Sequence, residues 1–232
     1  MSAPKQLTVA ILPVKKLAVA KSRLAEGLDG SARQTLATAM VRDALAQIDL
    51  ASKVDRLIVA TSDPQVAEFA GDFQVSTEDA DVSHSLAAAA AIRKALELGA
   101  SRVALLAGDC PLMTAEAIDQ LITHCDEQQL GVAVVPDRDG RGTNALVLSP
   151  PTAIVPAFGP GSSARHLQLA AAADVSAAIV PIEAMALDID TADDWGQLAL
   201  IVDGDSRVGV NTENALAEIM QNRHKLPGGL AR

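Results

Sequence analysis

The chain has 232 residues, of which 49% are hydrophobic, and a formal net charge of −10, so it can bury one sizeable core. An acidic chain with only 2% aromatic residues and no Tyr lacks the basic face and stacking platforms of nucleic-acid-binding proteins. No apolar run reaches about 18 residues and no signal-peptide pattern opens the chain, so we expect no membrane association. The two cysteines, Cys110 and Cys125, are not at metal-ligand spacing, which predicts reduced thiols in a cytoplasmic protein.

Predicted strands and helices alternate along the chain, with runs of Val, Ile, Leu and Ala as strands and capped, periodic stretches as helices. Strands are expected at residues 7–14, 56–61, 103–107, 132–136, 144–148 and 177–182. Helices are expected at residues 31–48, 63–70, 84–98, 114–127, 162–173 and 191–201. Ser31 and Gln34 fit a capping box for the first helix. The alternation favours an α/β fold with a mostly parallel sheet covered on both faces.

The alternating pattern ends near residue 202. We therefore expect one domain over residues 1–202 and a C-terminal extension over residues 203–232 that is partly helical or flexible. A helix at 214–222 in this extension is one option for a homodimer interface, and the Gly- and Pro-bearing end is expected to fray. Ligands of open α/β sheets bind beyond the carboxyl ends of the strands, so the segments that follow the strands are the candidates for chemistry.

A basic cluster follows the first predicted strand and consists of Lys15, Lys16, Lys21 and Arg23. In so acidic a chain, this cluster could hold a triphosphate, because Lys and Arg neutralise the charge that builds on transferring phosphates. The alternative is a solvated basic loop. The segment is not a P-loop, since it lacks the Gly-x4-Gly-Lys-Ser/Thr pattern.

Acidic residues follow two later strands. Asp109 is the second residue after the strand at 103–107. Asp188 and Asp190 lie two apart in an extended segment, so the side chains of these two share one side. Carboxylates so close together are costly without a cation, and Mg²⁺ prefers such ligands. The alternatives are that Asp109 caps a turn and Asp190 caps the helix at Thr191, but capping does not explain Asp188.

Hydroxyl groups mark three further segments. A glycine-bearing turn at 158–161 delivers Ser162 and Ser163 to a helix start, which can bind an anion or can be an ordinary helix cap. His166 in the same helix is expected to be a surface or packing residue rather than a base. Thr143 in a loop could donate to a phosphate, and Ser85 at a helix start could face a base or ribose, although each signal is weak alone.

Together these motifs resemble the phosphoenolpyruvate or 2-phospho-L-lactate guanylyltransferases of coenzyme F420 biosynthesis (CofC/FbiD type). The resemblance spans about residues 7–200, and its most specific parts are the run from Phe158 to His166 and the later Asp-x-Asp-Thr. The matching stretches are Pro13-Val14-Lys15-Lys16-Leu17, Ala20-Lys21-Ser22-Arg23-Leu24, Gly108-Asp109-Cys110-Pro111-Leu112, Gly142-Thr143-Asn144-Ala145-Leu146, Phe158-Gly159-Pro160-Gly161-Ser162-Ser163-Ala164-Arg165-His166 and Asp188-Ile189-Asp190-Thr191. One departure is Leu86-Ala87, where family members often carry Leu-Asn near the nucleotide.

The resemblance implies a three-layer α/β sandwich with a mixed, mostly parallel sheet, the glycosyltransferase-A-like nucleotidyltransferase fold. It implies that Asp109, Asp188 and Asp190 bind Mg²⁺ and, with Lys21, carry the catalysis. It further implies an acceptor-phosphate site at Thr143, Gly159, Ser162 and Ser163. The nucleotide would be bound by Lys15, Lys21, Arg23 and Ser85.

The expected reaction joins GMP from GTP to the phosphate of phosphoenolpyruvate or 2-phospho-L-lactate and releases pyrophosphate. The alternatives are a molybdopterin guanylyltransferase or a sugar-phosphate nucleotidyltransferase, although both usually carry a Gly-rich loop where this chain has Pro13-Val14-Lys15-Lys16. A glycosyltransferase would be expected to use aromatic sugar platforms, which are scarce here. A non-catalytic nucleotide-binding module also stays open. Triad hydrolases and Rossmann dehydrogenases are disfavoured, because their motifs are absent.

Overall fold

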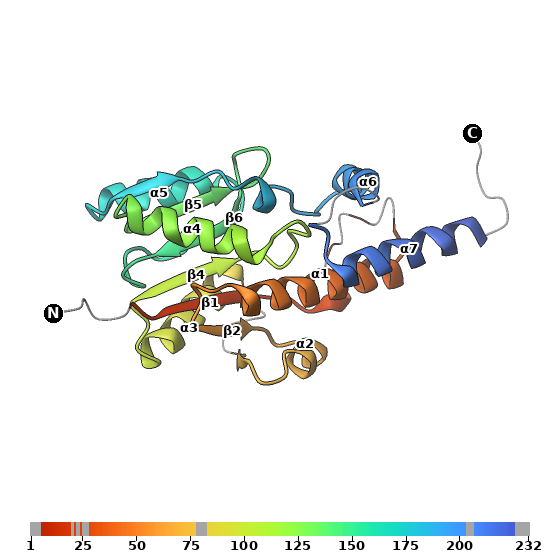
Figure 1. The fold of residues 1–232 in the computed structure, drawn as a ribbon, viewed down its shortest axis with the longest axis horizontal. Helices are drawn as coiled ribbons and strands as arrows, with labels where there is room; N and C mark the ends of the chain where they lie inside the picture. The colour runs from red at the N-terminus through yellow and green to blue at the C-terminus, as the bar shows by residue number, and fades with distance from the viewer. Residues whose placement is uncertain are drawn as a thin grey trace.

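The computed structural model describes residues 6–19, 21, 24, 28–77, 83–202 and 207–225. A seven-stranded sheet forms its centre, with the strand order β3-β2-β1-β4-β6-β5-β7 (Figure 1). The strands are β1 (Thr8–Pro13), β2 (Arg56–Ala60), β3 (Gln74–Ser76), β4 (Arg102–Leu106), β5 (Val132–Pro136), β6 (Thr143–Leu148) and β7 (Ala177–Ile179). β6 runs antiparallel to its neighbours β4 and β5, and the other four pairs are parallel. The predicted mixed, mostly parallel sheet is confirmed.

Helices cover both faces of the sheet. They are α1 (Gly30–Leu50), α2 (Pro64–Phe69), α3 (His84–Glu97), α4 (Ala115–Glu127), α5 (Ser162–Ala172), α6 (Ala192–Ile201) and α7 (Val210–Lys225). Successive residues of β1 point to opposite faces, so Ala10 and Leu12 pack with α1, α2 and α4, while Val9 and Ile11 pack with α3 and α5. This arrangement is the predicted three-layer sandwich.

A third hydrophobic cluster lies where α1 extends beyond the sheet. Figure 1 shows α7 lying alongside α1 there, with α6 close by. The buried side chains of this cluster come from α1, α6, α7 and the loops between elements, and include Leu36, Met40, Trp195, Leu198, Leu216 and Ile219. Asp43 of α1 forms hydrogen bonds with the start of α7. Its carboxylate accepts the backbone N–H of Asn211 at 3.1 Å and that of Thr212 at 2.7 Å. Polar and apolar contacts therefore both fix α7 on α1.

Two details differ from the sequence-based expectations. Helix α1 begins at Gly30 and is capped by Asp29, whose carboxylate accepts the N–H of Ala32, so the expected capping box of Ser31 and Gln34 is wrong. The Gln34 side chain donates to Gln65 of α2 instead. Strand β3 was not expected, because it has only three residues, two of them with exposed side chains, and gives no apolar run.

Two other expectations concern the chemical environment of the chain. Cys110 and Cys125 are both buried as free thiols. In the part of the chain that the structure describes, none of the helices combines the length and the apolar character needed to cross a membrane.

Candidate active site

A cavity of about 340 Å³ opens at the carboxyl ends of β1 and β4. These two strands are neighbours, and β1 pairs on its other side with β2, so the chain crosses over in opposite directions from this point of the sheet. Such a switch point is where open α/β sheets bind ligands. The polar and charged side chains that line the cavity are Lys15, Lys21, His84, Asp109, Thr143, Asn144 and Asp190. Residues from four separate sequence motifs therefore meet in one cavity.

Lys21 joins two of the predicted acidic residues. Its ammonium donates to the carboxylate of Asp109 and, at 2.8 Å, to Oδ1 of Asp190. Burial by itself would lower the pKa of Lys21, but the charges of Asp109 and Asp190 outweigh burial and raise this pKa above its ordinary value. Lys21 is therefore a fixed cation at the point where the segment after β4 meets the segment before α6.

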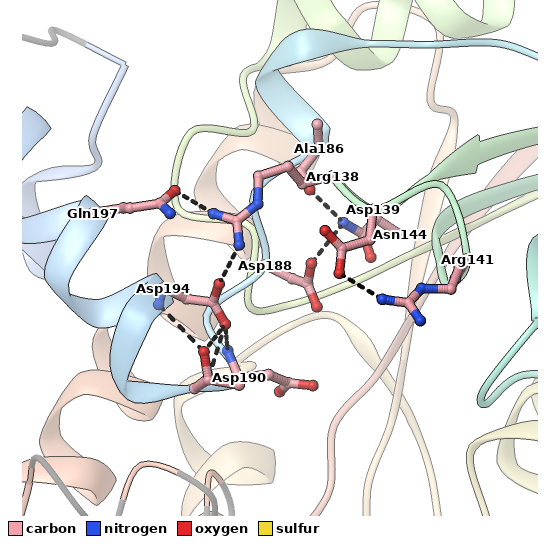
Figure 2. Close-up of polar contacts among 10 residues, drawn as sticks. Arg138, Asp139, Arg141, Asn144, Ala186, Asp188, Asp190, Asp194 and Gln197 are labelled. Carbon is pink, nitrogen blue, oxygen red and sulfur yellow. Dashed lines mark hydrogen bonds and ion pairs between the residues drawn. The ribbon is translucent and has the colours of Figure 1, made fainter.

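Asp188 lies beside this pair without sharing its cation. Its Oδ1 accepts a hydrogen bond of 3.2 Å from the side-chain amide of Asn144, which also donates to the carbonyl oxygen of Ala186 (Figure 2). The same amide donates to the carbonyl oxygen of Met185. Burial, and after it the nearby charges of Asp109 and Asp190, together raise the pKa of Asp188 to about 6. Asp188 is thus close enough to Asp109 and Asp190 to be repelled by both.

Thr143 connects the start of β6 to helix α5. Its Oγ1 lies 2.9 Å from Oγ of Ser162 and 3.2 Å from Nδ1 of His166. Ser162 is only 1% exposed and His166 is fully buried, so this polar cluster is closed to water on the side of α5. Since Thr143 also lines the cavity, one hydroxyl group joins the cavity to the buried start of the helix.

The turn before α5 depends on two glycines. Gly159 and Gly161 have φ angles of 111° and 72°, which favour glycine because side chains clash in this region. Within the turn, the N–H of Ser162 donates to the carbonyl of Gly159, and the N–H of Ser163 donates to the carbonyl of Arg141. The predicted acceptor-site residues are therefore adjacent, and Ser163 is held against the loop that precedes Thr143.

A family model described as "Guanylyl transferase CofC like" matches residues 8–219, which include every strand and all but the last residues of α7. The chain belongs to this guanylyl transferase family. The match extends past residue 202, so the family model includes most of the segment that the sequence pattern set apart as an extension.

Individual relatives agree with the family. A phosphoenolpyruvate guanylyltransferase of Conexibacter woesei is 36% identical over 220 residues, which are 94% of this chain and 99% of the relative. A 2-phospho-L-lactate guanylyltransferase of Methanothermobacter thermautotrophicus is 30% identical over 200 residues, which are 85% of this chain and 86% of the relative. The solved structure of a 4-diphosphocytidyl-2C-methyl-D-erythritol synthase has a TM-score of 0.60 at 15% identity, covering 87% of this chain and 100% of that one. This last likeness supports the nucleotidyltransferase fold.

The carboxylates of this CofC-type chain have the chemistry of a divalent-cation site, because burial and then the charges of Asp109 and Asp190 disfavour the ionised form of Asp188, and a cation would relieve that cost. Over the residues that the structure describes, however, no three His, Cys, Asp or Glu side chains are placed to hold one ion together. Asp109 and Asp190 instead share the ammonium of Lys21. Binding of Mg²⁺ by Asp109, Asp188 and Asp190 stays a prediction.

Of the other predicted nucleotide-binding residues that the structure describes, Lys15 and Ser85, only Lys15 is among the residues that line the cavity. Ser85, at the start of α3, accepts a 2.9 Å hydrogen bond on its Oγ from the N–H of Phe158, so it links α3 to the turn before α5. Ala87, the departure from the family pattern, is buried against the sheet. Arg23 lies outside the described residues.

Sequence reasoning missed three residues that shape the site. His84 lines the cavity, where burial and then the charge of Lys15 lower its pKa. Asn144 holds Asp188, and Asp194 holds the backbone beside Asp190. Asn144 lies in the stretch from Gly142 to Leu146 that resembles the family, and Asp194 lies three residues after Thr191, at the spacing of a capping box, so both had a signal in the sequence.

Proposed function

We propose that this chain transfers the GMP group of GTP to the phosphate of phosphoenolpyruvate or 2-phospho-L-lactate, as in coenzyme F420 biosynthesis, and releases pyrophosphate. The names of the two relatives described above support this substrate pair. The observation that carries the proposal is the meeting of Lys15, Lys21, Asp109, Asp190 and Thr143 in one cavity at the sheet's switch point. That cavity offers cations for a triphosphate and a hydroxyl for a second phosphate.

The proposed reaction needs no strong base. A phosphate oxygen of the acceptor forms a bond to the α-phosphorus of GTP while the bond from that phosphorus to the α–β bridging oxygen breaks, and pyrophosphate leaves with the electron pair. Phosphate monoesters have a second pKa near 6, so the attacking oxygen is already ionised at neutral pH. His166 agrees with this, because its Nε2 lone pair already accepts the N–H of Ala157 and its lowered pKa makes the imidazole a weak base. Catalysis then consists of positioning and charge neutralisation.

Each group of residues has a part in this proposal. Lys15 and Lys21 neutralise the phosphates of GTP, and Thr143 with the turn before α5 binds the acceptor's phosphate. Mg²⁺ is proposed to bind to Asp109, Asp188 and Asp190, and when bound it supplies positive charge to the reacting phosphates. Because Lys21 pairs with Asp109 and Asp190, it links the nucleotide side of the cavity to the carboxylates.

The test of the function is a pyrophosphate-release assay with the full chain. GTP and Mg²⁺ are incubated with phosphoenolpyruvate, 2-phospho-L-lactate or 3-phosphoglycerate, and products are identified by mass spectrometry. We expect release that requires both GTP and one of the first two acids. Binding of GTP without release in any combination would contradict the proposal and favour a non-catalytic nucleotide-binding module.

The Asp188→Asn variant tests the role of the carboxylates within this function. The substitution preserves side-chain size and removes the charge, so we expect kcat to fall at least about a hundredfold with an unchanged circular dichroism spectrum. Asp193→Asn, which removes a carboxylate from the first turn of α6, is the matched control and is expected to retain near-native kcat. Near-native turnover of Asp188→Asn at saturating Mg²⁺ would contradict this role.

A further inference from the structure

His166 is a buried polar side chain to which the proposed reaction gives no direct role. It lies in the first turns of α5 and is 0% exposed. Its Nε2 accepts a hydrogen bond of 2.9 Å from the backbone N–H of Ala157, and its Nδ1 lies 3.2 Å from Oγ1 of Thr143. The ring of Phe158 packs edge-on against it, with the centroids 5.3 Å apart. These contacts fix the orientation of the imidazole.

The bond from Ala157 determines which ring nitrogen carries the proton. A backbone N–H can only donate, so Nε2 must be unprotonated. Burial, followed by the charge of Arg165, lowers the pKa of His166 to about 4, so the ring is neutral near pH 7. A neutral imidazole has one N–H, and the only position left for it is Nδ1, which therefore donates to Thr143.

This donation fixes the direction of the Thr143 hydroxyl. Since Oγ1 accepts from His166, its own proton must point elsewhere, either to Ser162 Oγ at 2.9 Å or into the cavity that Thr143 lines. Phosphate oxygens at neutral pH act as acceptors, so a hydroxyl must donate to bind them. The histidine thus prepares Thr143 to be a donor to an anionic ligand.

We propose that His166 is a positioning residue that holds the Thr143 hydroxyl as a hydrogen-bond donor toward the phosphate of the acceptor acid. This inference rests on the proposed function for the identity of the ligand. The tautomer of His166 and its partner atoms are independent of that function.

Two substitutions separate the two hydrogen bonds of the ring. In His166→Asn, the side-chain amide can reach the position of Nδ1 and still donate to Thr143. In His166→Gln, the amide reaches the position of Nε2, so it can accept from Ala157 but gives Thr143 no donor. We expect His166→Gln to raise KM for the acceptor about tenfold and His166→Asn to change it within about twofold. KM for GTP is expected to stay constant in both variants, whose folding is checked by thermal unfolding.

Arg165→Gln is the matched control for a general loosening of the turn. The Arg165 guanidinium donates to the carbonyl oxygens of Ala157 and Pro160, so it holds the same segment as His166 without contacting Thr143. We expect its KM for the acceptor to stay within about twofold of the native value. Equal changes in KM for His166→Gln and Arg165→Gln, or for His166→Gln and His166→Asn, would show a purely structural role and overturn the proposal.

A double-mutant cycle with Thr143→Val tests the path of the effect. If His166 acts through Thr143, then His166→Gln adds no further change in KM for the acceptor once Thr143 is Val. The same tenfold increase in that background would overturn the inference.

A nitrogen NMR spectrum of the labelled native chain gives a readout besides activity. We expect the Nδ1–H tautomer at pH 7, and an Nε2–H tautomer would overturn the inference whatever the activity. If instead the tautomer is as expected but no acid supports pyrophosphate release, the proposed function fails while the donor relation of His166 to Thr143 stands.

Discussion

Burial shifts two side chains of the site toward their uncharged forms. Burial raises the pKa of the Asp188 carboxyl to about 6, and it lowers the pKa of the His166 imidazole to about 4. Both shifts have the same physical cause, since a low-dielectric surrounding disfavours charge of either sign. The consequences differ, because Asp188 is proposed to meet a cation, whereas His166 already has both ring nitrogens in hydrogen bonds.

The lowered pKa of His166 predicts a pH-dependent stability. In the unfolded chain a histidine has a pKa near 6.5, so between about pH 6.5 and pH 4 the unfolded state binds more protons than the folded state. The native chain therefore loses stability as the pH falls through this window, by an amount on the order of 2 kcal/mol. Gln has no ionisable side chain, so the His166→Gln variant does not show this loss of stability between about pH 6.5 and pH 4.

Urea unfolding at pH 7 and at pH 4 measures this difference. We subtract the unfolding free energy of His166→Gln from that of the native chain at each pH. This difference is expected to be about 2 kcal/mol smaller at pH 4 than at pH 7. A difference in unfolding free energy that is the same at both pH values would contradict a neutral, buried His166.

Individual residues differed in how far the sequence could place them. Asp109, Asp188 and Asp190 were expected together because strand ends and two-residue spacing are local features of the sequence. The partnership of His166 was not foreseen, since its ring is fixed by Thr143 and by the backbone of Ala157, which only the folded chain brings together. Sequence alone therefore suggested a surface or packing residue.

At the scale of single elements, the start of α6 fixes the acidic segment. Oδ2 of Asp194 accepts the backbone N–H groups of Asp190 and Thr191 at 3.1 and 2.8 Å, and Oδ1 accepts from Arg138 at 3.0 Å (Figure 2). Arg138 lies between β5 and β6, in the loop that precedes Thr143. Asp194 thus connects this loop with the segment that carries Asp190.

We expect Asp194→Asn to weaken this cap. The variant loses the charge that pairs with Arg138 and one acceptor for the backbone, which should cost about 1 kcal/mol in unfolding free energy. Because the backbone of Asp190 is then held less firmly, the Mg²⁺ concentration for half-maximal pyrophosphate release should rise. Thermal unfolding and a Mg²⁺ titration measure the two effects. An unchanged Mg²⁺ requirement in a variant that is less stable would limit Asp194 to a structural role.

Most strands and helices followed from local patterns, and the exceptions have clear causes. Six of the seven strands were expected, because they are apolar runs of mostly Val, Ile, Leu and Ala. β3 was missed because it is short and half-exposed and forms only by pairing with β2. The start of α1 was misplaced by a residue, because the helix is capped by the carboxylate of Asp29, two residues before the expected cap Ser31.

At the scale of the whole molecule, the helix after residue 209 supports a wall of the cavity. Met40 of α1 packs in the third hydrophobic cluster with Leu216 and Ile219 of α7, and it also lines the cavity. The alternation of strands and helices gave no sign of this connection, since α7 follows the last strand and its partner α1 precedes the second one. Packing of distant elements is set by the folded chain rather than by the local pattern.

Leu216→Ala tests whether α7 unfolds with the rest of the chain. Leu216 is 1% exposed, so its truncation leaves a cavity in the third cluster and should cost about 3 kcal/mol. If α7 and α1 form one cooperative unit, urea unfolding followed by circular dichroism and by Trp195 fluorescence should give one coincident transition at lower urea. Leu200→Ala, the same substitution at a position 84% exposed, should change the unfolding free energy by less than about 0.5 kcal/mol. A separate early transition for part of the helical signal, with the remainder unchanged, would mean that α7 supports α1 only loosely and that the cavity wall is stable without it.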